Sequence, residues 1–285
     1  MLRSSGIGLG KKKIIIWEWR DRKLVIGERT LVMGILNVTP DSFSDGGRFI
    51  HPLQALERAR QMVAEGAAVI DVGGESTRPG SSPVGCQEEM DRVMPVLELL
   101  LKEIPAPISL DTYKSEVARE GLRLGVHIIN DVGGGKKDPR MAEVAAGEDV
   151  PVIIMHNPPS PCYQDVVSKV INDLAESIEI YGKAGLGAEK IMVDPGVGFG
   201  KDFQGNLTLL RNIRAFDSLD NPLLLGASRK SFIGKLLETE PPDRLEGSLA
   251  AVAWGVTHGV AMVRVHDVKE TVRLIRVLEA IQNGE

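Results

Sequence analysis

Residues 31–47 read LVMGILNVTPDSFSDGG, and this stretch decides the fold. An apolar run at 31–36 stops at the amide of Asn37, and a polar loop rich in turn residues follows it. Strands built of near-continuous Val, Ile and Leu are typical of parallel sheets that helices cover on both faces. The stretch therefore predicts a buried strand whose carboxyl end opens onto a functional site.

The same pattern recurs along the chain. Further apolar runs that end in polar side chains span 68–72, 107–110, 126–129, 152–155, 191–193, 223–227 and 261–263. Between them lie segments with helical periodicity, among them 53–65, 88–103, 113–124 and 166–184. Eight strand–helix units predict an α/β fold of the (β/α)8, or TIM, barrel class, which usually needs about 250 residues. The barrel is expected to form one domain over residues 31–285. A doubly wound open sheet is the alternative, because periodicity does not count strands.

The first 30 residues precede this pattern. The mainly apolar stretch 14–19 and the apolar residues 24–26 flank the charged stretch 20–23. This arrangement predicts an N-terminal β-hairpin that plugs the lower end of the barrel.

Composition excludes two classes of partner. The net charge of −5 leaves no basic footprint for nucleic acid. No apolar run approaches the roughly 18 residues that a membrane span needs. Residues 1–6 have no long apolar region behind them, so we expect no secretion signal and a cytoplasmic location. Cys86 and Cys162 lie far apart in the sequence and are expected to be reduced thiols.

The carboxyl ends of barrel strands share one face, where the active site lies. Acceptor side chains end three of the middle runs, at Asp111, Asn130 and Asp194. A buried carboxylate usually accepts a hydrogen bond from a donor group. These residues therefore fit a flat heterocycle that carries an N–H and an exocyclic amine. The alternative is that some of them cap helices or close loops. For Asp111 this reading is open, because residues 112–115 could begin a helix.

A second group of side chains suits an anion. Ser228, Arg229 and Lys230 follow the seventh run, and Arg264 alternates with His266 after the eighth. Loops after strands seven and eight form the usual phosphate site of such barrels, where Arg binds bidentately and Lys acts as a point charge. The alternative for the Ser-Arg-Lys triplet alone is a solvated helix start.

Three loops at the predicted active-site face stand out. Residues 39–48 and 75–85 are long and polar, which favours substrate clamps over plain surface loops. Residues 194–201 are glycine-rich and carry one aromatic side chain, Phe199. They do not form a dinucleotide fingerprint, because the required glycine spacing before a helix is missing.

Taken together, these segments resemble the dihydropteroate synthase family, the folate-pathway target of sulfonamides. The resemblance covers residue 31 to the C-terminus in the family's order. The motifs that carry it span 34–47, 74–80, 109–114, 129–132, 194–201, 226–232 and 264–267. No single motif decides the matter, but seven in register leave little room for coincidence.

The resemblance implies an enzyme, a transferase of folate biosynthesis. It would join 6-hydroxymethyl-7,8-dihydropterin pyrophosphate to 4-aminobenzoate, releasing pyrophosphate and giving 7,8-dihydropteroate. Mg²⁺ would bridge the pyrophosphate and the amide oxygen of Asn37, because Mg²⁺ is often held mainly by phosphate oxygens and water. The resemblance also implies a homodimer, with an expected interface on the last helices, including residues 245–259.

The same resemblance implies a division of the site into three parts. The pterin would contact Asp111, Asn130, Met155, Asp194 and Lys230. The pyrophosphate would contact Asn37, Arg264 and His266. The aminobenzoate would lie against Thr77, Arg78, Pro79, Phe199, Ser228 and Lys230. The residues expected to support catalysis directly are Asp111, Lys230, Arg264 and His266.

The mechanism implied is dissociative displacement at the pterin methylene, with no dedicated general base. Two competing functions are a corrinoid-dependent methyltransferase barrel that binds a pterin, and an inactive barrel that only binds a ligand. The anion-binding side chains argue against the first, and the complete set of site residues argues against the second. His156, after the fifth run, departs from the common family pattern, and a role for it is not expected.

Overall fold

The computed structural model describes residues 13–19, 22–38, 52–75, 83–158 and 165–284. Eight parallel strands form its sheet, in the spatial order β8-β7-β6-β5-β4-β3-β10-β9. A bridge between Val193 and Leu223 joins the two edges of the sheet, so the predicted barrel is confirmed and the open sheet is wrong. The strands are β3 (Leu31–Asn37), β4 (Val69–Gly73), β5 (Ile108–Asp111), β6 (Ile128–Asp131), β7 (Val152–Met155), β8 (Ile191–Asp194), β9 (Leu224–Leu225) and β10 (Met262–Val265).

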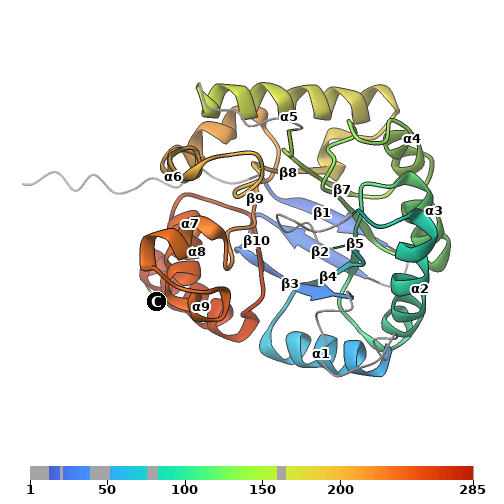
Figure 1. The fold of residues 1–285 in the computed structure, drawn as a ribbon, viewed down its shortest axis with the longest axis horizontal. Coiled ribbons are helices and arrows are strands. Elements are labelled where there is room, and N and C mark those ends of the chain that lie inside the picture. Colours follow the sequence, from blue (N-terminus) through green and yellow to red (C-terminus); the bar gives the residue numbers. More distant parts are fainter. Residues whose placement is uncertain (1–12, 20–21, 39–51, 76–82, 159–164, 285) are drawn as a thin grey trace, which may run out of the picture.

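Helices surround the strands on all sides (Figure 1). The four helical segments that periodicity predicted are confirmed to within two residues at each end, as α1, α2, α3 and α5. The helices are α1 (Pro52–Glu65), α2 (Cys86–Glu103), α3 (Ser115–Leu124), α4 (Arg140–Gly147), α5 (Val166–Lys183), α6 (Phe203–Arg211), α7 (Ser231–Leu237), α8 (Leu245–Thr257) and α9 (Val268–Asn283). Short 3-10 turns occupy Ala188–Lys190, Ile213–Leu219 and Pro241–Asp243.

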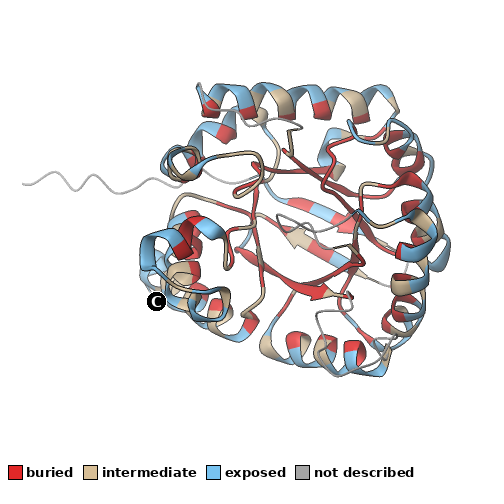
Figure 2. Cartoon of the chain, in the orientation of Figure 1, coloured by how far each residue is buried: buried red, intermediate tan, exposed pale blue. Residues whose placement is uncertain are grey.

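The core has two layers, which follow from the alternation of side chains along each strand. On β4, Ile70 and Val72 face outward and belong to the large buried cluster under the helices. Val69 faces inward and belongs to a second cluster inside the barrel. Figure 2 shows the buried inner faces of the helices and the almost wholly buried strands of the barrel.

The N-terminal hairpin plugs the amino-terminal end of the barrel, as predicted. Its strands β1 (Ile15–Glu18) and β2 (Lys23–Ile26) pair antiparallel. Trp17 is 2% exposed, and its Nε1 donates to the carbonyl of Glu189 at 2.9 Å. The buried side chains of the hairpin pack in the same cluster as inward residues of the barrel strands. The hairpin therefore fills the lower end and leaves the opposite end for chemistry.

The outer surface carries apolar side chains on the last three helices. Among the described helices, none combines the length and the apolar character that crossing a membrane requires. α8 is apolar around its circumference, which is typical of helices with a second packing partner. The exposed large apolar residues of α7, α8 and α9 are Leu236, Leu237, Trp254, Val277 and Ile281.

Candidate active site

Side-chain alternation places a ring of polar groups inside the barrel mouth, by which we mean the carboxyl ends of β3–β10. The inner cluster includes Met33, Val69, Ile128, Met192 and Met262. Residues two or four positions further along each strand face the same side. Asp111 joins them because it pairs in register with Asn130. The inward-facing set at the mouth is Asn37, Asp71, Asp111, Asn130, Met155, Asp194, Arg264 and His266.

Arg264 is the centre of this ring. Its Nε donates to Asp71 Oδ2 at 2.6 Å, and its Nη2 donates to Asp111 Oδ2 at 2.7 Å. The amide of Asn130 also donates to Asp71 Oδ2, at 3.0 Å. One guanidinium thus ties β10 to β4 and β5 across the barrel. Its Nη1 makes no hydrogen bond to any residue that the structure describes.

The ring sits in a weakly solvated environment, and the pKa values respond to it. Burial raises the pKa of Asp111 to about 7, although Arg264 acts in the opposite direction. Burial tends to lower the pKa of Arg264, but the charges of Asp71 and Asp111 more than compensate and raise it. Arg264 is therefore a permanent cation, and Asp111 is a carboxyl group that titrates near neutrality.

Asp194 and Met155 form the neighbouring wall. The Asp194 side chain is 5% exposed, and its Oδ1 accepts a hydrogen bond from the backbone N–H of Gly196 at 2.8 Å. Burial raises the pKa of Asp194. Met155 is 5% exposed yet belongs to neither core cluster, so its thioether lines the mouth rather than filling the core.

Acceptor oxygens remain free in this wall. No described residue donates to Asp111 Oδ1, Asn130 Oδ1 or Asp194 Oδ2, and none of the three atoms is a fully buried orphan. The reading of Asp111 as a helix cap is wrong. The first N–H of α3, at Ser115, is bonded instead by Asp138 Oδ2 at 2.9 Å.

Lys230 lies in the loop after β9, directly before α7. Its Nζ lies 4.0 Å from the centre of the Phe199 ring, a cation–π contact. Burial, and then the charge of Arg264, lower the pKa of Lys230 to about 8. Within the described residues the ammonium has no carboxylate partner at ion-pair distance. It is a half-buried donor group without an acceptor among the described residues, which favours a ligand oxygen or ring nitrogen as its partner.

Lys230 is presented by an unusual turn. Arg229, just before it, adopts a left-handed conformation with φ +58°, which side chains with a Cβ rarely take. Its backbone N–H donates to Ser248 Oγ at 2.9 Å, and its guanidinium forms a bidentate pair with Asp267. Arg229 therefore faces away from the mouth, and of the Ser-Arg-Lys triplet only Ser228 and Lys230 line the site.

His266 and Ser228 face each other at the end of β10. The Ser228 hydroxyl accepts from the His266 backbone N–H at 3.2 Å and lies 3.1 Å from His266 Nδ1. Burial, followed by the charges of Arg264 and Arg229, lowers the pKa of His266 to about 3. The ring is therefore neutral. In the tautomer in which Nδ1 accepts from the Ser228 hydroxyl, the proton sits on Nε2, which is then a donor.

Asn37 ends β3 on the rim of the mouth. Its side chain is half-buried and makes no hydrogen bond to the described residues. No group of three or more His, Cys, Asp or Glu side chains that could hold a metal occurs among the described residues. This donor set fits Mg²⁺ only where phosphate oxygens and water supply most of the ligands.

The second loop of the mouth lies largely outside the described residues. Thr77, Arg78 and Pro79 belong to that part of the chain, so their predicted roles stay predictions. The base of the loop is described. There, Lys114 Nζ bridges the carboxylates of Glu75 and Glu89, both well shielded from solvent.

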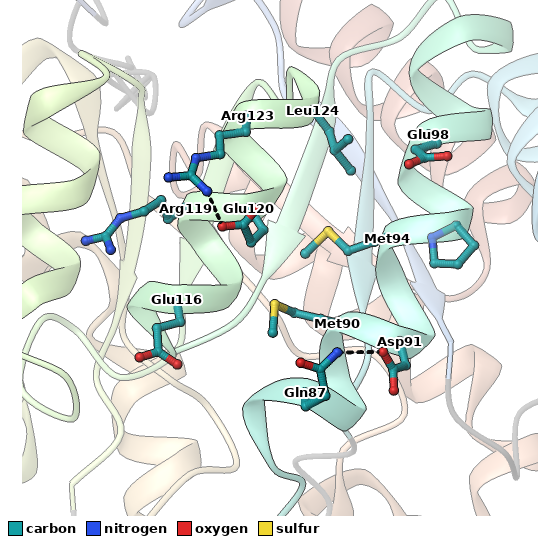
Figure 3. A pocket seen from close by; sticks show the side chains of 11 residues that line it. Gln87, Met90, Asp91, Met94, Glu98, Glu116, Arg119, Glu120, Arg123 and Leu124 are labelled. Carbon is teal, nitrogen blue, oxygen red and sulfur yellow. Dashed lines mark hydrogen bonds and ion pairs between the residues drawn. The ribbon is translucent and has the colours of Figure 1, made fainter.

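One groove of the molecule lies away from the mouth. A groove of about 690 Å³ lies between α2 and α3 on the outside of the barrel. Figure 3 shows Met90, Met94 and Leu124 on its walls, with charged side chains around them. The side chains that the sequence predicted for the site gather at the mouth and not in this groove.

Asp71 is the site residue that sequence reasoning missed. The prediction considered the side chains that end each apolar run, whereas Asp71 lies inside its run. Its position supplied a signal, because a carboxylate at an inward-facing place in a buried strand requires a cation. One of its oxygens, Oδ1, is buried without a hydrogen-bond partner, as is the hydroxyl of Ser109 in register beside it.

Known proteins show the same fold and closely related sequences. The family model described as pterin binding enzyme matches residues 33–266. The dihydropteroate synthase of Bacillus subtilis is 48% identical over 256 residues, which cover 90% of each chain. A crystal structure of dihydropteroate synthase from Clostridium difficile with pteroic acid is 50% identical, with a TM-score of 0.88, covering 90% of this chain and 98% of that one. The Xanthomonas albilineans dihydropteroate synthase with 4-aminobenzoic acid is 40% identical, with a TM-score of 0.91, covering 95% and 99%.

Proposed function

This chain belongs to the dihydropteroate synthase family of pterin-binding enzymes, and we propose that its barrel mouth divides into pterin, pyrophosphate and aminobenzoate parts. Its reaction is that of the family, a transferase step of folate synthesis. The chain condenses 6-hydroxymethyl-7,8-dihydropterin pyrophosphate with 4-aminobenzoate to 7,8-dihydropteroate and pyrophosphate. The corrinoid-dependent methyltransferase is not a candidate for a chain so similar to these synthases.

One observation carries the pterin assignment. Three acceptor oxygens, on Asp111, Asn130 and Asp194, share the mouth with the ammonium of Lys230, and none of these four groups has a hydrogen-bond partner among the described residues. A dihydropterin presents the complementary set, because its amine and ring N–H donate while its carbonyl oxygen and a ring nitrogen accept. Met155 supplies an apolar surface for the flat ring. Burial makes each of these hydrogen bonds more selective than it would be in water.

The pyrophosphate assignment uses Asn37, Arg264 and His266. Arg264 keeps Nη1 available while Asp71 and Asp111 hold the rest of the guanidinium in place. His266 contributes an N–H donor rather than a charge, because its pKa is lowered to about 3. We assign Asn37 as the protein ligand of Mg²⁺. When bound, Mg²⁺ supplies positive charge that stabilises the departing pyrophosphate.

The aminobenzoate would lie between Phe199, Lys230 and the second loop. The ring of Phe199 offers an aromatic face, already in contact with Lys230. Ser228 shapes the wall through its bonds to His266 rather than with a free hydroxyl. Thr77, Arg78 and Pro79 complete this part in our proposal.

The chemistry proposed is dissociative. The bond between the methylene carbon and the pyrophosphate oxygen breaks, and its electron pair leaves with the pyrophosphate. The electron-rich dihydropterin shares the positive charge, which the carboxylates of Asp111 and Asp194 favour. The lone pair of the aromatic amine then forms the C–N bond, and the extra proton passes to water. Arg264 stabilises the charge on the leaving group, the usual electrostatic contribution of a preorganised site.

We further propose a cytoplasmic homodimer. The exposed apolar side chains of α7, α8 and α9, Trp254 among them, are our candidates for the interface. Cys86 is a free thiol, which agrees with a reducing compartment. Sedimentation at several protein concentrations tests the dimer.

The deciding experiment measures pyrophosphate release from dihydropterin pyrophosphate in Mg²⁺, with and without 4-aminobenzoate. We expect release coupled to dihydropteroate formation and dependent on the amine. A second arm measures aminobenzoate binding, which we expect to require pyrophosphate and Mg²⁺ first. Tight pterin binding without any release would contradict the proposed function and indicate a binding protein.

A further inference from the structure

The glycine-rich turn after β8 packs between the backbone at His156, which follows β7, and the side chain of Lys230. Gly196 has φ +65°, and a Cβ there would lie 2.0 Å from the carbonyl oxygen of His156. Gly198 has φ +87°, and a Cβ there would lie 2.9 Å from Cδ of Lys230. Only glycine fits such close approaches at positive φ. Because the turn contacts both, a shift of the backbone after β7 is expected to move the side chain of Lys230.

Lys201 closes this turn from inside. Its ammonium lies 2.7 Å from Nδ1 of His156, 3.1 Å from the His156 carbonyl oxygen and 2.8 Å from the Gly196 carbonyl oxygen. Three acceptors match the three N–H donors of a lysine ammonium. The cation thus binds both sides of the turn and lies at its base rather than in the mouth.

The imidazole of His156 is fixed for this purpose. The side chain is 3% exposed, and its Nε2 lies 3.0 Å from Oδ2 of Asp173 on α5. Burial and the charge of Lys201 lower the pKa of His156 to about 4, so the ring is neutral. An ammonium only donates, so Nδ1 accepts and the proton resides on Nε2, facing Asp173. Asp173 is itself held by Lys169 at 2.7 Å.

The turn carries Phe199 at its tip. The backbone N–H of Phe199 donates to the Gly196 carbonyl at 3.0 Å, the same oxygen that Lys201 binds. The Phe199 ring in turn contacts the Lys230 ammonium. A chain of direct contacts therefore runs from Asp173 through His156 and Lys201 to the aromatic face of the mouth.

We propose that Lys201 and His156 are positioning residues for the aminobenzoate half of the site. They touch no substrate and act by holding the glycine-rich turn so that Phe199 lies against Lys230. This inference rests on the proposed function, because it assigns Phe199 to the aminobenzoate. It reverses the expectation that His156 has no role.

The first test replaces the cation by an apolar side chain of similar length, Lys201→Met. The KM for 4-aminobenzoate is expected to rise by about ten- to one-hundredfold, because the glycine-rich turn no longer holds Phe199 in place for the aminobenzoate. The Kd of the pterin substrate, measured by calorimetry without aminobenzoate, should stay within about threefold. The control is Lys183→Met, which removes an exposed lysine of α5 paired with Glu179 and should change neither constant.

The second test separates a positioning role from damage to the fold. His156→Leu removes the acceptor for Lys201 and should raise the aminobenzoate KM as Lys201→Met does. His156→Asn places an amide oxygen near the position of Nδ1 and should restore the KM to within about threefold of the wild type. If Lys201→Met does not fold, this pair of variants decides alone.

Three results would overturn the inference. The first is an unchanged aminobenzoate KM in Lys201→Met and His156→Leu. The second is an equal loss of pterin and aminobenzoate binding in these variants. The third is the same aminobenzoate KM in His156→Asn and His156→Leu. Each comparison is made with a wild type that is active. Absence of amine-dependent pyrophosphate release from the wild type would instead overturn the proposed function.

Discussion

Replacing Arg264 by methionine tests the charge balance of the barrel mouth most directly. The substitution preserves an unbranched side chain but leaves Asp71, which is fully buried, and Asp111, which is 12% exposed, without their common cation. Breaking a buried ion pair by removing one partner costs roughly 3–5 kcal/mol. Arg264 is itself 19% exposed, so water compensates in part and we expect about 3 kcal/mol.

That loss has a measurable thermal signature. A chain of 285 residues has an unfolding entropy of about 0.6 kcal/mol per K, so the midpoint should fall by about 5 °C. Catalysis should suffer independently, with kcat lowered by about 10²–10³ because leaving-group stabilisation is lost. Differential scanning calorimetry and the pyrophosphate assay provide the two measurements.

The pH dependence sharpens the prediction. The pKa of Asp111 is raised to about 7, above its ordinary 3.8, so the folded state takes up a proton more readily than the unfolded chain. The contribution of such a group to the free energy of unfolding is lost as the pH rises from about 4 towards 7. Without Arg264 the pKa of Asp111 rises further. The midpoint difference between variant and wild type should therefore be larger at pH 8 than at pH 5.5.

Two companion variants make the reasoning refutable. Arg60 also pairs with two carboxylates, Glu57 at 3.0 Å and Glu103 at 2.8 Å, but on the surface. Arg60→Met should leave the midpoint nearly unchanged. Adding Asp71→Asn to Arg264→Met removes one unpaired carboxylate and should recover part of the lost stability. A pH-independent loss, or a double variant less stable than Arg264→Met, would refute the assignment of this ring as a charge-balanced network.

Three further outcomes are expected. The pKa of Lys230 is lowered to about 8, so its ammonium is lost as the pH rises through that value, and pterin affinity measured by calorimetry should decline above pH 8. Lys230→Ala should abolish both the affinity and its pH dependence. Unchanged affinity in this variant would disprove the contact. Trp17→Ala empties a site that is 2% exposed and should lower the free energy of unfolding by about 3–5 kcal/mol in urea titrations, with kcat per folded molecule unchanged at the opposite end of the barrel. Chelation of Mg²⁺ should stop pyrophosphate release, and Asn37→Ala should raise the Mg²⁺ concentration needed for half-maximal rate; an identical Mg²⁺ curve would remove Asn37 as a ligand.

The sequence by itself determined the architecture. Apolar runs at eight places specify strands that are buried on both faces. Successive side chains of a strand alternate between its two faces, and this parity specifies which of them face the barrel interior. Parity places Asn130 and Arg264 in the mouth. It also places His156 on the opposite side from Met155. These properties are local, because they depend only on residues within a few positions of each other.

Tertiary structure alone decided which of these side chains are partners. Asp71 and Arg264 are separated by 193 positions in the sequence, and only closure of the barrel brings the carboxylate of β4 to the guanidinium of β10. The left-handed turn at Arg229 sends its charge to Asp267, away from the mouth, although the neighbouring Lys230 points in. Lys201, after β8, likewise binds His156, after β7, although the two residues are 45 positions apart in the sequence. Pairing of charges depends on distance and desolvation in three dimensions, which a linear pattern of residue types does not contain.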